Sequence, residues 1–121
     1  MKEVLAGILL LAGAAFVLLS ALGAVRMPDV FTRMQATCKA STLGVLLLAL
    51  GAAVHFADAG AGVRAAAIVV FYFVTNPVAA HVIARAAYFV DANIWPGTVI
   101  DELEGRYDEK NHRLLSPPAG E

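Results

Sequence analysis

The chain has 121 residues, of which 60% are hydrophobic and 16% are charged, and its mean hydropathy is +0.71. Soluble domains contain about 45–50% apolar and about 25% charged residues, so this composition favours a membrane protein over a soluble enzyme. The net charge of −1 implies no strong electrostatic attraction to nucleic acid. A single cysteine, Cys38, excludes an internal disulfide.

The first apolar segment covers residues 4–25 and contains no charge and only one hydroxyl, that of Ser20. A helix of this length spans roughly 33 Å at about 1.5 Å per residue, and the hydrocarbon core of a bilayer is about 30 Å thick. We therefore predict a transmembrane helix. A signal peptide with Lys2 as its basic region is the competing interpretation, but the apolar part of a signal peptide runs over about 7–15 residues.

Small residues recur at seven-residue spacing in this segment. They form two adjoining tracks, Ala6, Gly13 and Ser20 in one and Gly7, Ala14 and Ala21 in the other. Gly44 and Gly51 repeat the spacing in the second apolar segment. Small residues let membrane helices approach closely. The tracks therefore predict either tight packing within the chain or contact with helices of other subunits.

The connection over residues 26–39 combines apolar and charged residues. Its apolar residues recur at helical spacing: Met27, Val30, Phe31, Met34 and Cys38. Pro28 suits a first helical position. Asp29 and Arg33 lie four apart, in the acid-first order that favours a helical ion pair. We predict a short amphipathic, interfacial helix that leads into the second span.

The second apolar segment covers residues 40–57 and is near the lower length limit for a membrane span. A short flexible loop is expected at 59–62, before a third apolar segment over residues 65–90. Residues 91–121 form a polar tail, in which we predict a short surface helix followed by disorder. The predicted fold is an all-α membrane protein with three transmembrane helices.

Thr75, Asn76 and Pro77 lie near the middle of the third span. Proline has no N–H to donate, and its ring clashes with the carbonyl four residues earlier. Polar backbone at membrane depth is tolerated only inside protein or beside a water-filled cavity, and transporters often place ion sites at broken helices. These residues therefore predict either a hinge or cation-coordinating point, or a packing kink healed by the threonine hydroxyl.

His81 and Arg85 follow Pro77 at four-residue spacing on one helix face. Arg85 can extend to the membrane interface. His81 lies deeper, and is a candidate either for a proton relay or for a hydrogen bond to a neighbouring subunit. The apolar segments contain no acidic residue, and the chain has no phosphate-binding loop, metal-ligand spacing or paired nucleophile and base. We expect no enzyme activity, metal or cofactor, and a part of a transporter rather than a whole one.

The basic residues predict how the chain is oriented in the membrane. One side would carry Arg26, Arg33, Lys39, Arg85, Arg106, Lys110 and Arg113. The other side would carry only Lys2 and Arg64. Because Lys and Arg accumulate on the cytoplasmic side, we predict that the N-terminus lies outside and that the first connection and the C-terminus are cytoplasmic.

Four short motifs resemble the signatures of the MnhG or PhaG family, one of the small-subunit families of the Mrp-type multisubunit sodium/proton antiporter. They are Arg26-Met27-Pro28-Asp29-Val30-Phe31-Thr32-Arg33, Lys39-Ala40-Ser41-Thr42-Leu43-Gly44, Thr75-Asn76-Pro77-Val78-Ala79-Ala80-His81 and Arg85-Ala86-Ala87-Tyr88. The match covers roughly residues 1–90, with the motifs in the right order. Many family members have histidine where this chain has Gln35, so no proton role is carried over to that position.

The resemblance implies a non-catalytic, multi-pass subunit in a bacterial plasma membrane. Such complexes exchange cytoplasmic Na+ for external H+; the expected partners are other subunits, lipid and these ions, without a cofactor or nucleic acid. The small subunits pack beside the large proton-translocating ones and are thought to help form the sodium path. From the residues alone, a stand-alone homo-oligomeric transporter or a holin-like pore is the alternative.

Two roles remain open within the family interpretation. The ion-path or hinge candidates are Thr75, Asn76, Pro77 and His81. The candidates for a subunit interface on the cytoplasmic side are Arg26, Pro28, Asp29, Arg33, Lys39, Thr42, Gly44 and Arg85.

Overall fold

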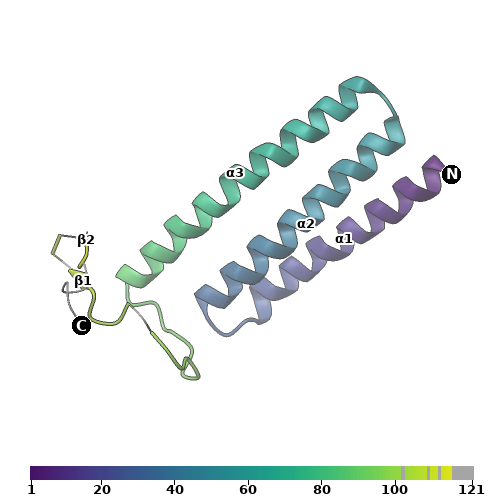
Figure 1. Cartoon of the computed structure of the whole chain (residues 1–121). Helices are drawn as coiled ribbons and strands as arrows, with labels where there is room; N and C mark the ends of the chain where they lie inside the picture. Colours follow the sequence, from purple (N-terminus) through teal and green to yellow (C-terminus); the bar gives the residue numbers. More distant parts are fainter. Residues whose placement is uncertain (102, 109, 112, 116–121) are drawn as a thin grey trace.

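The computed structural model describes residues 1–101, 103–108, 110–111 and 113–115 (Figure 1). Three long helices follow one another, α1 (Lys2–Arg26), α2 (Val30–Phe56) and α3 (Ala59–Phe89). Each has the length and hydropathy of a membrane span. The prediction of three apolar, membrane-spanning helices is confirmed.

The described part of the tail contains no helix where we expected a short one. It forms instead a small antiparallel hairpin of β1 (Tyr107–Asp108) and β2 (Arg113–Leu114). The predicted disorder falls largely on residues 116–121, outside the described residues. The hairpin is the one exception to the predicted all-α class among the residues that the structure describes.

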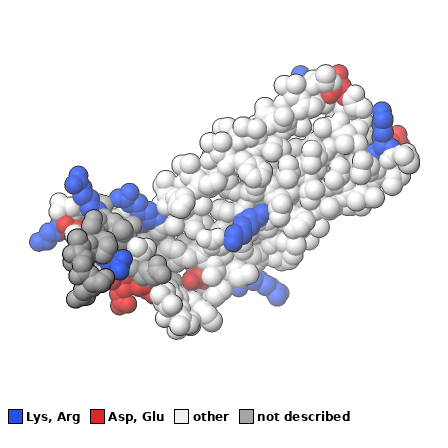
Figure 2. Space-filling view, in the orientation of Figure 1, with Lys and Arg blue, Asp and Glu red and all other residues white. Residues whose placement is uncertain are grey.

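Each helix runs antiparallel to the next one in the chain, and the two ends of the bundle carry different connections (Figure 1). The α1–α2 connection and the tail lie at one end, which we call the tail end. The N-terminus and the α2–α3 turn lie at the other. On the face that Figure 2 shows, most charged side chains gather at these two ends, and the surface between them carries one isolated basic side chain. This is the distribution that an apolar bilayer requires.

The connection between α1 and α2 is shorter than predicted. α2 begins at Val30 rather than near residue 40, so the expected interfacial helix is the first part of α2 itself. Pro28 precedes the N-cap residue, Asp29, rather than occupying the first helical turn. The 3.6-residue pattern in this stretch was therefore a correct sign of helix, but the helix has no break before the apolar segment.

The predicted Asp29–Arg33 ion pair is wrong. The Asp29 carboxylate caps α2 by accepting a hydrogen bond from the Thr32 N–H at 2.7 Å. The Arg33 Nε donates to the Met27 carbonyl at 2.7 Å. Both side chains satisfy backbone groups that the ends of helices leave without intrahelical partners.

The predicted loop at 59–62 is also wrong, because α3 begins at Ala59. The chain reverses over Ala57, which adopts a left-handed conformation at φ 48°, and Asp58. The Asp58 carboxylate accepts hydrogen bonds from the N–H groups of Gly60 at 2.9 Å and Ala61 at 3.3 Å. An aspartate cap thus starts a helix where glycine content alone suggested a flexible loop.

α1 and α2 pack closely through the first track of small residues. Ala6, Gly13 and Ser20 are all buried. A Cβ on Gly13 would come within 2.9 Å of the Gly44 carbonyl oxygen and 2.8 Å of the Leu48 side chain. The Ser20 hydroxyl adds a hydrogen bond to the Thr37 carbonyl at 3.2 Å. This track is therefore used for packing within the chain.

The second track faces away from α2. Ala14 and Ala21 are exposed, and a Cβ on Gly7 would meet nothing within 4 Å among the described residues. The two tracks adjoin in the sequence, yet the structure uses only one of them to join helices of this chain.

α3 is attached to the bundle much more loosely than α1 and α2 are to each other. All residues of the three helices are described, and α3 packs against α2 without contacting α1. It lies on the far side of α2 (Figure 1). Within Ala59–Phe89 the only buried residue is Ala87. The helix also passes through Pro77 without interruption. A helix this exposed has most of its surface available to lipid or to other proteins.

The α1–α2 contact predicts opposite effects for two glycine substitutions. Alanine in a helix is favoured over glycine by roughly 0.5–1 kcal/mol, so Gly7→Ala should leave stability unchanged or raise it. Gly13→Ala should lower it by about 1–3 kcal/mol, because its Cβ meets backbone atoms of α2. The free energy of unfolding, measured by titrating SDS into mild-detergent micelles, tests this. Equal effects of the two variants would contradict the packing described here.

Candidate functional site

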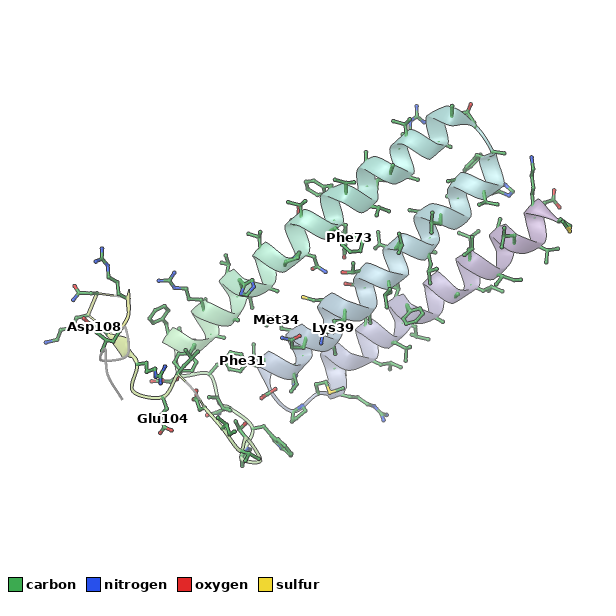
Figure 3. All side chains as sticks on the ribbon, viewed as in Figure 1. Phe31, Met34, Lys39, Phe73, Glu104 and Asp108 are labelled. Carbon is green, nitrogen blue, oxygen red and sulfur yellow. The ribbon has the colours of Figure 1, made fainter. Side chains whose placement is uncertain are left out.

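A groove of about 980 Å³ opens between α2 and α3 in the half of the bundle nearer the tail. Its walls are residues 31–43 of α2 and 73–88 of α3, and Leu103 of the tail lies at its end. Phe31, Met34 and Phe73 lie in the space between the two helices (Figure 3). The groove is mostly apolar, and its polar groups are few and identifiable.

Asn76 holds the two walls together. Its side-chain amide donates hydrogen bonds to the Cys38 carbonyl at 3.0 Å and to the Thr42 hydroxyl at 2.6 Å. The Thr42 hydroxyl in turn donates to the Cys38 carbonyl at 2.6 Å. In hydrocarbon such groups need partners inside the protein, and here α2 and α3 supply them to each other. The NH2 group of Asn76 is therefore committed to bonds between the helices.

The four ion-path or hinge candidates do not gather in one place. Asn76, Pro77 and His81 border the groove. Thr75 is exposed and does not belong to the groove wall. The triplet that looked like one polar element in the sequence is thus split, because consecutive helical residues point in directions about 100° apart.

The interface candidates are also distributed over different environments. Lys39, Thr42 and Arg85 line the groove together with His81. Gly44 is packed against α1 and is not on the groove wall. Arg26, Pro28 and Arg33 are exposed at the tail end, and Asp29 is buried there.

The register of α1 and α2 shows how deep Lys39 lies. Gly13 contacts both Gly44 and Leu48, and Gly44 contacts both Gly13 and Val17. These contacts place Lys39 level with Ser20, five residues inside the end of the apolar run at residue 25. At about 1.5 Å per residue this is a depth of about 7.5 Å. Lys39, whose side chain is exposed, therefore lies level with the apolar run of α1 rather than at the boundary of a span that starts at residue 40.

The groove is basic. Lys39, His81 and Arg85 line it, and none of its described lining residues is Asp or Glu. The Arg85 guanidinium lies 5.6 Å from the centre of the Phe89 ring. No metal-binding cluster of three or more His, Cys, Asp or Glu occurs in the described parts of the chain. The charged side chains among the described lining residues of the groove are therefore all of one sign.

A second polar cluster ties the tail to the bundle. Asp29 is only 7% exposed and accepts hydrogen bonds from the Thr32 N–H and hydroxyl and from the Trp95 N–H at 3.4 Å. The pKa of Asp29 is lowered mainly by the hydrogen bonds from Thr32, because they stabilise the carboxylate, and the Trp95 N–H lowers it further. The tail segment around Trp95 is thus held against the α1–α2 connection.

Sequence reasoning missed several residues of the groove. Phe31, Gln35 and Cys38 recur at helical spacing along one face of α2, in line with the interface candidate Thr42. That stripe was visible in the sequence, but it was divided between a supposed interfacial helix and a separate span. Tyr88 donates a hydrogen bond to Asp101 at 3.3 Å, which brings the tail, with Leu103, to the end of the groove. This long-range contact has no sequence signal.

The PhaG_MnhG_YufB family model, described as a Na+/H+ antiporter subunit, matches residues 9–88. The chain belongs to this family. A Na+/H+ antiporter subunit of Alkalihalophilus pseudofirmus is 33% identical over 113 residues, which cover 89% of this chain and 92% of that relative. The resemblance stated from the four motifs is confirmed.

Two solved structures contain chains with the same fold as this member of the PhaG/MnhG/YufB family. A chain of the Mrp complex from Dietzia sp. DQ12-45-1b has a TM-score of 0.78 and 28% identity, covering 84% of this chain and 91% of that one. A chain of the membrane-bound sulfane sulfur reductase, an archaeal respiratory membrane complex, has a TM-score of 0.76 and 37% identity, covering 84% and 94%. The protein is a small, multi-pass membrane subunit of a multisubunit antiporter, and its partners are the other subunits.

The Asn76 bonds predict that this residue, and not its neighbour Thr75, stabilises the attachment of α3. Asn76→Ala should weaken that attachment by about 0.6–1.7 kcal/mol, the range of hydrogen bonds between membrane helices. Thr75→Ala removes a hydroxyl that is exposed and should have little effect. Spin-label distances between α2 and α3 in detergent would measure the separation. The prediction fails if both variants keep the wild-type distance distribution.

The capping role of Asp29 predicts a pH-dependent stability. Its pKa is lowered in the folded state from an ordinary value of 3.8, so its charge stabilises the fold above that value and the contribution is lost as pH falls through the lower, folded-state pKa. Asp29→Asn keeps a cap acceptor without the charge. The wild type should exceed this variant in free energy of unfolding at pH 7, and the difference should shrink towards pH 3. A difference that stays constant over this range would contradict the assignment.

Proposed function

We propose that this chain serves mainly as an assembly subunit of a complex that exchanges cytoplasmic Na+ for external H+. In this proposal the groove between α2 and α3 seats a transmembrane helix of another subunit of the same complex. The observation that carries it is an open groove between two apolar helices, with Lys39 level with the apolar run of α1 and no acidic residue among its described lining residues. The subunit itself has no catalytic role.

The case for a protein occupant rests on the polar groups of the groove. Lipid tails are as apolar as leucine, so an apolar surface alone gives no reason for a partner. Gln35 and Lys39, however, border the groove within the length of the helices and need protein or water beside them. A partner helix would provide polar contacts for these groups and close packing for the apolar walls.

A direct Na+ site on this chain is less well supported. The NH2 group of Asn76 donates to α2 and thereby fixes this side chain between the helices, and Thr75 is not on the groove wall. Lys39 and Arg85 would repel a sodium ion in the groove. The subunit therefore contributes to the ion path by positioning groups of other subunits. His81 keeps a second candidate role as a proton relay, since it is exposed on the groove wall.

The rigid part of the subunit suits an assembly role. α1 and α2 are joined by close glycine contacts, whereas the described side-chain hydrogen bonds between α3 and α2 are those of Asn76. A similar chain occurs in a complex named as a sulfane sulfur reductase, and a support element is compatible with complexes of different activity. We place the tail end in the cytoplasm, because the α1–α2 connection and the tail carry most of the basic residues.

Site-specific photocrosslinking in membranes that contain the whole complex tests this proposal. A photoreactive residue at Leu43, which is 45% exposed and lines the groove, should crosslink to a helix of another antiporter subunit. Val74 is 64% exposed and does not line the groove, so a photoreactive residue there is the matched control and should give a different or weaker product. The absence of any protein crosslink from Leu43, or a crosslink only to a second copy of this chain, would overturn the proposal.

A further inference from the structure

We infer that the helix seated in the groove carries an aspartate or glutamate at the level of Lys39, and that this carboxylate pairs with the Lys39 ammonium. The inference rests on the proposed function, since it names the chemistry of the partner that the groove would take. It concerns a single charge pair. The pairing can therefore be wrong even if another subunit's helix does dock in the groove.

Lys39 has no counter-ion within the described chain. Among the described residues, no ion pair or hydrogen bond engages its side chain, and no Asp or Glu lines the groove with it. Asp29 is committed to Thr32 and Trp95 at the tail end. Asp58 caps α3 at the opposite end of the bundle.

Extension of the lysine towards water does not remove the need for a counter-ion. A lysine stem can carry its charge several ångströms along an apolar surface, and the nearer end for Lys39 is the tail end. In that direction the groove passes Phe31 and Met34 and contains His81 and Arg85 on the opposite wall. The ammonium would move past the Arg85 side chain. The Asp101 carboxylate at that end of the groove already accepts hydrogen bonds from the Tyr88 hydroxyl and from the Leu103 N–H.

The charged side chains among the described lining residues of the groove are all basic. Lys39 comes from α2, and His81 and Arg85 come from α3. An acidic side chain on a helix between these walls would face nitrogen groups from both. A lipid phosphate is a poorer match, because Lys39 lies about 7.5 Å inside the apolar run of α1 and phosphates lie outside the hydrocarbon.

The first test changes the charge of Lys39 in the intact complex. Lys39→Met removes the charge with little change in length, Lys39→Arg keeps it, and Lys2→Met removes a lysine outside the apolar segments. Co-purification of this subunit with the complex in mild detergent should fall at least five-fold in Lys39→Met, relative to its level in the membrane. It should remain within two-fold of wild type in the other two variants. Normal assembly of Lys39→Met would overturn the inference.

The second test identifies the carboxylate. The helix that crosslinks to Leu43 should contain an aspartate or glutamate that lies level with Lys39. Neutralising that residue in the Lys39→Met background should restore assembly, because an unpaired buried charge is worse than no charge. The reversed pair, Lys39→Glu with the partner carboxylate changed to Lys, should also assemble better than either single variant.

The outcomes separate the two proposals. If Leu43 crosslinks to a subunit helix without an acidic residue at this level, or if neither double variant improves on the single ones, the carboxylate pairing is wrong and the docking helix stands. If Leu43 gives no protein crosslink, both are wrong.

Discussion

The close contact between α1 and α2 is the interaction on which the depth of every other group depends. The glycine at position 13 lies against Gly44 and Leu48, and neither helix can slide past the other without a clash. Because α1 carries an uninterrupted apolar run, this register relates each position of α2 to the hydrocarbon. It places Lys39 level with Ser20, within the length of the apolar run of α1. The functional interpretation of the groove follows from that placement.

α3 obeys a different constraint. It has little packing to hold it, since Ala87 is the only buried residue within its span, and its strongest described link to α2 is the pair of hydrogen bonds from Asn76. A few polar contacts between membrane helices contribute modestly to stability. This leaves the helix splayed along its length nearer the tail, where the groove opens. The same residue that looked like an ion ligand in the sequence is therefore what keeps the groove in place.

The sequence was sufficient for the number of helices and for the family, because long apolar runs and ordered motifs are local features. It was insufficient for the helix starts. Asp29 and Asp58 each begin a helix by accepting backbone N–H bonds. The first was interpreted as half of an ion pair, and the second was given no role beside the predicted loop at 59–62. Capping and pairing use the same side chains, and only the backbone geometry distinguishes them.

The groove itself was only partly predictable. Its α3 wall was recognised as the stripe of Pro77, His81 and Arg85, since these residues share one helix face. The α2 wall was not, because it required knowing that residues 30–56 form one helix. The contacts of Trp95 with Asp29 and of Tyr88 with Asp101 join separate segments of the chain. No pattern within a single segment predicts them.

The lack of an acidic residue in the apolar segments takes on a more definite meaning in the folded chain. In the sequence it indicated that this protein is part of a transporter. In the structure it becomes an imbalance at one place, a groove whose described lining residues include Lys39, His81 and Arg85 and no carboxylate. When opposite charges are divided between two subunits, each charge is costly while its subunit is alone in the membrane. Association of the two subunits pairs the charges and removes that cost. In such a division, the positive charge of the groove is neutralised only when the partner subunit supplies a carboxylate. Charge neutralisation is thereby linked to assembly of the complex.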